Sequence, residues 1–279
     1  MSQDNHNKIR RAKLSAISKI HYGKMALRGV IFLAAAVAYL VERLEGDSMS
    51  IGHSGWGTWV LIAAWLLLMT EMVLRLFPTR TESMGCQRQF AKNYKPTGHA
   101  PVKPKNQTRA TAGIVAAWAA LNGAIGVLFF TGVIDAGILL LISLAYSVCD
   151  MICILLFCPF QVWFLKNKCC TTCRIYNWDF AMMFTPLLFI PHLYTWSLLG
   201  MGLVLLIRWE ITYRRHPERF YECSNSSLAC ANCEERLCNQ KTSIQHLRKR
   251  VLAELKEELV DLKEDLGELK DNIRKKTGR

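Results

Sequence analysis

Cysteine is the residue type in this sequence with the clearest capacity for chemistry. Eight of the eleven cysteines fall into two groups, one in FCPFQVWFLKNKCCTTCR at residues 157–174 and one in CSNSSLACANCEERLC at residues 223–238. The members are Cys158, Cys169, Cys170 and Cys173 in the first group, and Cys223, Cys230, Cys233 and Cys238 in the second. Each group contains one C-x2-C pair, a spacing that lets two sulfur atoms reach the same metal ion.

Two ligand arrangements fit this pattern. In one, the two C-x2-C pairs, 170/173 and 230/233, hold a single zinc ion and join two distant loops. In the other, each group of four holds its own iron–sulfur cluster, because such clusters use four cysteines at varied spacings. The sequence therefore predicts a metal centre, and leaves open whether it is an iron–sulfur cluster or Zn²⁺. Disulfides are the poorer alternative in a reducing compartment.

The remaining cysteines, Cys86, Cys149 and Cys153, are predicted to be free thiols that pack as small apolar side chains. No phosphate-binding glycine loop, nucleophile elbow or H-E-x-x-H helix is present in the sequence, so an enzymatic function is not favoured.

The first cysteine group carries a local resemblance to a known family. Cys158-Pro159 ends an apolar run and is followed by cysteines eleven, twelve and fifteen residues later. This resembles the membrane-bound ferredoxin-type proteins that take electrons from quinol, which implies iron–sulfur clusters and electron transfer. It covers less than a tenth of the chain, and the family has more cysteines before the proline and a tighter C-x2-C-x2-C run. The spans together with KCCTTCRIYNWD and RRHPERF…CANCEERLC also resemble uncharacterised bacterial membrane proteins, which implies no function.

Three polar side chains within apolar runs indicate a second kind of chemistry. A carboxylate such as Asp150, near the middle of a predicted span, is expensive in a membrane and marks an ion or proton path or a structural hydrogen bond between helices. Asn122 could approach Asp150 at similar depth. Glu71 is predicted to pair with Arg75, its i+4 neighbour.

The elements that must position these residues are apolar helices. Of the 279 residues, 51% are hydrophobic, and they occur in blocks of near-membrane length. We expect an all-α, polytopic membrane protein of about six spans. The predicted spans lie at 25–41, 56–77, 111–134 and 138–165, with two more helices or a re-entrant hairpin in the proline-interrupted run at 180–207.

The distribution of basic residues predicts the topology. Lysine and arginine cluster at residues 1–24 and in the loop 78–110, which places both segments, both chain ends and both cysteine groups in the cytoplasm. The predicted location is a bacterial inner membrane, and the net charge of +13 is explained by topology without nucleic acid. The loop 78–110 is interpreted as an irregular linker that could contact anionic lipid headgroups.

After the membrane domain at 25–213, the sequence predicts a cysteine module at 214–242 and an amphipathic helix at 243–279. Leucines at heptad spacing in this helix predict a homo-oligomeric coiled coil or a single helix packed on the protein's own surface. Three functions stay open: a redox or metal-responsive membrane component, an oligomeric channel or transporter, and a scaffold that recruits a partner through the coil.

Overall fold

The computed structural model describes residues 15–44, 56–79, 82–104, 106–166, 169–233 and 235, and these residues form an all-α fold. The long helices are α1 (Ala16–Leu44), α2 (Trp56–Arg75), α4 (Gln107–Phe130), α5 (Ala136–Leu155) and α7 (Leu193–Arg215). The chain divides into two units, 1–237 and 238–279. The predicted coil and oligomer contact at 243–279, Cys238 and the first fourteen residues lie outside the described residues.

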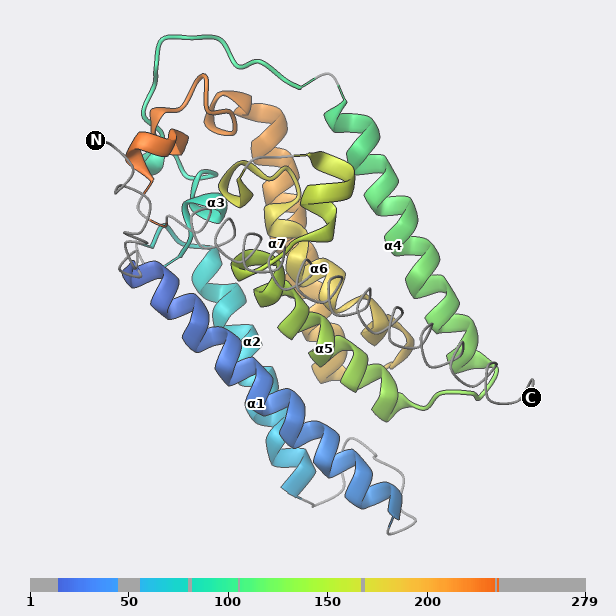
Figure 1. Cartoon of the computed structure of the whole chain (residues 1–279). Coiled ribbons are helices and arrows are strands. Elements are labelled where there is room, and N and C mark those ends of the chain that lie inside the picture. The colour runs from blue at the N-terminus through green and yellow to red at the C-terminus, as the bar shows by residue number, and fades with distance from the viewer. Residues whose placement is uncertain are drawn as a thin grey trace, which may run out of the picture. The chain divides into compact units, whose positions relative to one another are not determined.

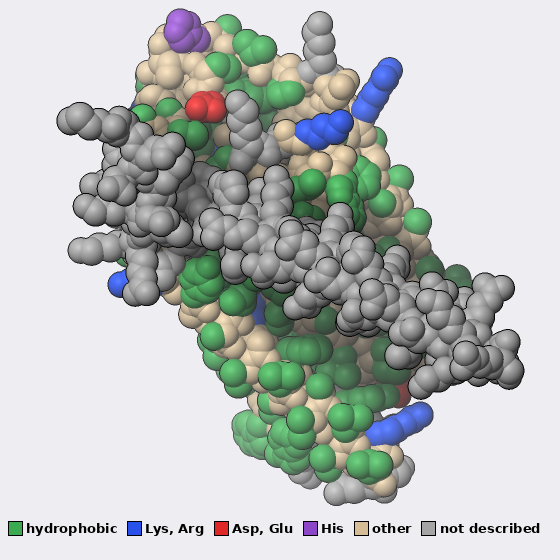
Figure 2. All heavy atoms as spheres, in the orientation of Figure 1, with side chains coloured by type: hydrophobic (Ala, Val, Ile, Leu, Met, Phe, Trp, Pro, Cys, Tyr) green, Lys and Arg blue, Asp and Glu red, His purple; other side chains and the backbone are tan. Residues whose placement is uncertain are grey.

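Four helices, α1, α2, α4 and α5, are long and apolar enough to cross a membrane. Their outward faces are apolar, as the stripe on α1 illustrates with Leu27, Val30, Leu33, Val37 and Leu40. Hydrophobic side chains cover much of the visible helix surface in Figure 2. The four helices suggest a multi-pass protein in contact with lipid, as predicted from the sequence.

The fourth predicted span is shorter in the structure than the apolar run that predicted it. Helix α5 ends at Leu155 because Pro159 lacks an N–H group and disfavours helical backbone at Cys158. The chain resumes as a π-helix, η2 (Phe160–Leu165), which ends at a left-handed Lys166 with φ 49°. The first cysteine group therefore begins after a break in the backbone.

The fifth predicted span is also interrupted. The segment forms α6 (Asp179–Met183) and the 3-10 helix η5 (Thr185–Phe189), with Pro186 in the first turn of η5. Its two prolines prevent a continuous α-helix. Helix α7 then starts after Pro191 and returns along the bundle. The first residue of this segment, Asp179, pairs with Arg75 at the end of α2, and its last, Phe189, packs against Phe129 and Phe130 at the end of α4.

The interrupted segment lies at the centre of the main hydrophobic core. Phe180, Met183, Phe184 and Leu187 are almost fully buried and pack with apolar side chains of the long helices α1, α2, α5 and α7. At Gly202 of α7, a side chain would meet the backbone of Phe180 and Ala181 at 3.2 Å. Helices α6 and η5 thus form the interior around which the long helices pack.

One end of the bundle carries the loops of interest, and we call it the cysteine end. There α1 begins, α2, α5 and α7 end, and α4 begins, as Figure 1 shows. The loop after α2 folds into α3 (Met84–Gln87) and η1 (Ala91–Asn93), and its side chains Cys86, Gln87 and Arg88 are buried. The prediction of an irregular linker at 78–110 was wrong for this part of the loop.

Three loops meet at the cysteine end. The fully buried Arg88 guanidinium donates hydrogen bonds to the carbonyl oxygens of Cys173 and Phe220. Trp209 of α7 packs edge-on against Phe220, with ring centroids 4.8 Å apart. Backbone hydrogen bonds from Thr97 and Ser226 add a short pairing between the first loop and the tail after α7. The two cysteine-bearing segments therefore share one end of the bundle.

Candidate functional site

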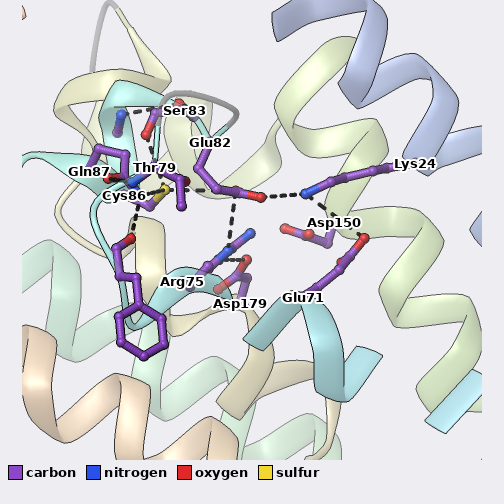
Figure 3. A network of polar contacts seen from close by, with 12 residues as sticks. Lys24, Glu71, Arg75, Thr79, Glu82, Ser83, Cys86, Gln87, Asp150 and Asp179 are labelled. Carbon is purple, nitrogen blue, oxygen red and sulfur yellow. Dashed lines mark hydrogen bonds and ion pairs between the residues drawn. The ribbon is translucent and has the colours of Figure 1, made fainter. Parts of the chain in front are cut away.

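Seven charged side chains form a buried ionic cluster near the cysteine end. They come from α1, α2, α5, α6 and the loop after α2, and they are Lys24, Arg28, Glu71, Arg75, Glu82, Asp150 and Asp179. Figure 3 shows most of this cluster, with Lys24 reaching between Glu82 and Glu71.

Arg28 holds the part of the cluster that faces α5. This side chain is 2% exposed and forms ion pairs with Glu71 of α2 and Asp150 of α5, the latter at 3.2 Å. It also donates to the carbonyl oxygen of Ser147 at 2.9 Å. Three helices are thus joined by one guanidinium group, which presents several donors in a fixed plane.

Arg75 holds the other part of the cluster. Its guanidinium contacts the Asp179 carboxylate at 2.5 Å and the Glu82 carboxylate at 3.8 Å. The Nζ of Lys24 lies 2.6 Å from Glu82 and 3.9 Å from Glu71, which connects the two parts. The Phe180 ring lies against both guanidinium groups, 4.5 Å from Arg75 and 5.9 Å from Arg28.

Several buried polar atoms in this region have no hydrogen-bond partner among the described residues. They include both ring nitrogens of His21, the Nε atom of Arg28 and one carboxylate oxygen of Asp179. Buried polar atoms usually have a partner, and ordered water or a bound ion is the usual one where protein supplies none. These atoms therefore add to the free-energy cost of burying the cluster.

The structure changes the interpretation of the three predicted polar residues. Asp150 lies five positions before the end of α5, so it is near the cysteine end of the span and not at its middle. Glu71 pairs with Arg28 and Lys24, so the predicted pair with Arg75 was wrong. Asn122 is buried, but its amide donates to the Trp118 carbonyl within α4.

Arg28 and Asp179 were missed by the sequence analysis. Arg28 follows Met25 by three residues and so lies inside the apolar run that predicted the first span. An arginine in that position is itself a signal, because isolated charges in a span usually have a partner. The first, second and fourth predicted spans together contain two basic residues, Arg28 and Arg75, and two acidic residues, Glu71 and Asp150. This balance of charge could have indicated that the spans are joined by ion pairs.

The predicted sulfur ligands are divided between two surroundings. The thiol of Cys170 donates to Gln161 at 3.1 Å, and Cys173 is buried. Cys169 turns toward Thr171. In the tail, Cys223 and Cys230 are exposed and Cys233 is half-buried. Within the described ranges, no three Cys, His, Asp or Glu side chains are already arranged to hold a metal ion.

Cys173, the buried member of the first sulfur group, lies beside a buried arginine. Burial raises the pKa of the Cys173 thiol to about 12, and burial lowers the pKa of the neighbouring Arg88 to about 10. Arg88 stacks on Trp209 and Phe220. Among the described residues it has no carboxylate at ion-pair distance. A buried cation without an anion is costly.

A matched arginine in the same region has the usual partner. Arg174 forms a two-point ion pair with Glu210 of α7, with contacts of 2.7 and 2.5 Å, and Trp178 donates to the same carboxylate at 2.9 Å. Tyr213 lies under the Arg174 guanidinium at 3.8 Å from the ring centroid. This pair fixes the loop after η2 to α7 and leaves Arg88 as the exception.

Glu82 supplies a prediction of pH dependence. Burial alone would raise its pKa, but the ion pairs with Arg75 and Lys24 outweigh burial and hold the pKa below the ordinary 4.5. A carboxyl whose pKa is depressed by folding stabilises the fold above its unfolded pKa, and this stabilisation is lost as the pH falls through the folded pKa. We expect the unfolding midpoint, measured in detergent, to decrease when the pH is lowered below about 4.5. In Glu82→Gln this decrease should be less steep.

The control for that measurement is Glu222→Gln, which removes an exposed acid from the tail at the same end. Its unfolding midpoint should follow the wild-type curve at every pH. A Glu82→Gln variant with an unchanged acid limb would show that the Glu82 ion pairs do not stabilise the fold.

Four apolar helices of spanning length, packed around a buried ionic cluster, suggest the class of multi-pass helical membrane proteins. The comparisons add no narrower identity, since no protein-family model, curated protein or solved structure matches the chain.

Proposed function

We propose that this protein binds and releases a proton within the membrane through its ionic cluster, and that it conducts or transports protons or small cations. The observation that carries the proposal is the charge count of the cluster. Three cations, Lys24, Arg28 and Arg75, face four carboxylates, Glu71, Glu82, Asp150 and Asp179. Fully ionised, the cluster would bury one negative charge, which is expensive. One proton or one bound cation removes that cost.

Asp150 is the carboxylate that we assign to this proton. Glu71 and Glu82 each face two cations, and Asp179 contacts Arg75 at 2.5 Å. Asp150 has a single ion pair, at 3.2 Å, and its side chain is the most exposed of the four at 14%. Protonation of Asp150 therefore disturbs the ion pairs of the cluster least.

A cavity supports access from the other end of the bundle. A space of about 230 Å³ lies between α2, α5, η5 and α7, and its lining reaches Leu68, Leu144 and Phe184. These side chains are one or two helical turns from Glu71, Asp150 and Phe180. An apolar layer thus separates the cavity from the ionic cluster, which is an arrangement suited to a gate.

Orientation and lipid contact belong to the same proposal. The exposed side chains Lys92, Lys95, Lys103 and Arg109 lie between α2 and the first turn of α4. Basic residues beside spans favour the cytoplasmic side, and on this ground we assign the cysteine end to the cytoplasmic side of a bacterial inner membrane. The same side chains could attract anionic headgroups by about 1 kcal/mol each.

The test is proton flux in reconstituted vesicles with a trapped pH-sensitive dye and an imposed membrane potential. We expect Asp150→Asn to reduce the flux to the level of protein-free vesicles. The matched control is Asp135→Asn, because Asp135 lies at the other end of α5, where it caps the helix and is partly exposed. It should retain the wild-type flux. Wild-type vesicles without flux, or an unchanged Asp150→Asn variant, would contradict the proposal.

A second candidate function is a redox or metal-responsive membrane component with a cysteine-ligated centre. The observation that favours it is the contact of Cys173, a member of the first C-x2-C pair, with the buried Arg88, which lacks a carboxylate at ion-pair distance among the described residues. An iron–sulfur cluster or Zn²⁺ held by thiolates would supply the missing negative charge. Metal analysis and visible spectroscopy of the purified protein test this candidate.

A further inference from the structure

The last described residue of the tail, Glu235, is buried against two other elements of the cysteine end. Its carboxylate accepts hydrogen bonds from the Ser83 hydroxyl at 2.8 and 2.9 Å and from the Met84 N–H at 2.6 Å. Its carbonyl oxygen accepts hydrogen bonds from Ser18 at 3.0 Å and Ser15 at 3.3 Å, at the start of α1. Glu235 is only 4% exposed. One tail residue therefore joins the loop after α2 to the start of α1.

The two elements that Glu235 joins also carry the two partners of an ion pair in the cluster. Ser83 directly follows Glu82, and Ser18 precedes Lys24 by six residues on α1. The Lys24 Nζ atom lies 2.6 Å from the Glu82 carboxylate. Figure 3 shows Ser83 beside Glu82, whose carboxylate points to Lys24. Glu235 thus fastens the backbone near both partners of the Lys24–Glu82 pair.

The Lys24–Glu82 pair lies on the cysteine-end side of Asp150. Arg28, the partner of Asp150, lies four residues further along α1 than Lys24, and α1 begins at the cysteine end. The Lys24–Glu82 pair is therefore about one helical turn nearer to that end. Lys24 is also the most exposed of the seven cluster side chains, at 19%. The pair therefore lies between Asp150 and the loops of the cysteine end.

We propose that Glu235 is a latch that holds the Lys24–Glu82 pair closed and so limits the passage of protons between Asp150 and the cysteine end. This inference rests on the proposed function and adds a control to it. Hydrogen bonds to a carboxylate are stronger than those between neutral groups, so the latch stabilises the closed arrangement. Its release lets the loop after α2 move away from α1, which separates the pair and admits water to Glu82.

The tail has a second attachment that does not involve Glu235. The Ser226 N–H donates to the Lys95 carbonyl at 2.9 Å, and the Lys95 N–H donates to the Asn225 side chain at 3.2 Å. Beyond Glu235, the second unit of the chain begins at residue 238. The latch therefore lies between a separately fastened part of the tail and a second unit. Such a contact can open locally without unfolding of the helix bundle.

The experiment measures proton flux through the full-length protein in reconstituted vesicles, with the dye and membrane potential used for Asp150→Asn. Glu235→Ala removes the latch carboxylate and should raise the flux about 5-fold or more, the lower end of the usual coupling between two sites. Ser83→Ala removes the hydroxyl that contacts both carboxylate oxygens and should also raise the flux. The double variant should exceed Glu235→Ala little, because both changes open the same latch.

A second measurement does not depend on flux. Hydrogen exchange of the Met84 amide, followed by mass spectrometry, reports whether the Glu235 carboxylate holds this N–H group. Glu235→Ala should lose the protection of this amide. Glu235→Gln keeps an acceptor oxygen and should lie between alanine and the wild type in both measurements. The matched control is Glu222→Ala, an exposed acid of the same tail, which should keep the wild-type flux and exchange.

Gel filtration establishes that each variant is folded, and Ser83→Ala and Glu235→Gln test the latch if Glu235→Ala does not fold. Unchanged exchange at Met84 in Glu235→Ala would show that the carboxylate does not hold the loop. Faster exchange with unchanged or reduced flux would overturn the latch alone, since loss of flux in Asp150→Asn would still support the proposed function. Wild-type vesicles without flux would remove the proposed function and the latch together.

Discussion

Replacement of Arg28 by methionine is expected to lower the free energy of unfolding by about 3–5 kcal/mol, the usual cost of removing one partner from a buried ion pair. The change leaves the Glu71 and Asp150 carboxylates buried without their nearest cation. Methionine keeps much of the apolar stem, so the loss reports charge and hydrogen bonding more than volume. Chemical or thermal unfolding in detergent measures the effect.

Two comparisons make this prediction specific. Arg43→Met removes the cation of a largely exposed pair with Asp135, whose atoms are 3.6 Å apart, and should cost at most about 1 kcal/mol. Adding Glu71→Gln to Arg28→Met removes one of the stranded charges and should restore part of the lost stability. If Arg28→Met unfolds like the wild type, the ionic cluster does not hold α1 to its neighbours.

Phe180→Ala is expected to destabilise the protein by a similar amount, about 3–5 kcal/mol. The ring is fully buried at the start of the interrupted segment. It packs in the main core and lies against the guanidinium groups of Arg75 and Arg28. Its removal therefore opens a cavity and exposes two cations to the space left behind. The same unfolding measurement applies.

Phe180→Leu separates the two contributions. Leucine fills most of the volume but has no aromatic face, and a desolvated cation–π contact is worth about 2 kcal/mol. The leucine variant should therefore fall between alanine and the wild type. Phe130→Ala is the control, since Phe130 is 74% exposed on the outside of α4. A leucine variant as stable as the wild type would show that packing alone accounts for Phe180.

The apolar runs predicted the long helices well because hydropathy over about twenty residues is a property of sequence alone. Helix ends were less predictable. The run at 138–165 stays apolar past Pro159, and only the backbone shows that α5 ends at Leu155 and a π-helix follows. The same error placed Asp150 near the middle of a span.

The ion-pair partners of the buried charged residues could not be predicted from their spacing along one helix. Glu71 and Arg75 are four residues apart, yet each finds a partner on another element, Glu71 on α1 and Arg75 on α6. Cross-helix partners can approach more closely than i+4 neighbours, and a tertiary contact overrides the local preference. The cysteine groups show the same limit: Cys169 and Cys170 are adjacent in sequence, but the Cys169 thiol contacts Thr171 and the Cys170 thiol contacts Gln161.

The buried hydrogen bond between Arg88 and Phe220 limits how early the cysteine end can fold during synthesis. The Arg88 side chain donates a hydrogen bond to the carbonyl of Phe220, and the ribosome adds Phe220 132 residues after Arg88. At about 5–20 residues per second, roughly 7–26 s pass between the two. Throughout that interval the first loop carries an arginine whose final surroundings do not yet exist. The cysteine end can therefore be completed only after α7 and the residues up to Phe220 have been synthesised. A chain truncated before residue 220 would present an incomplete surface to quality-control proteases.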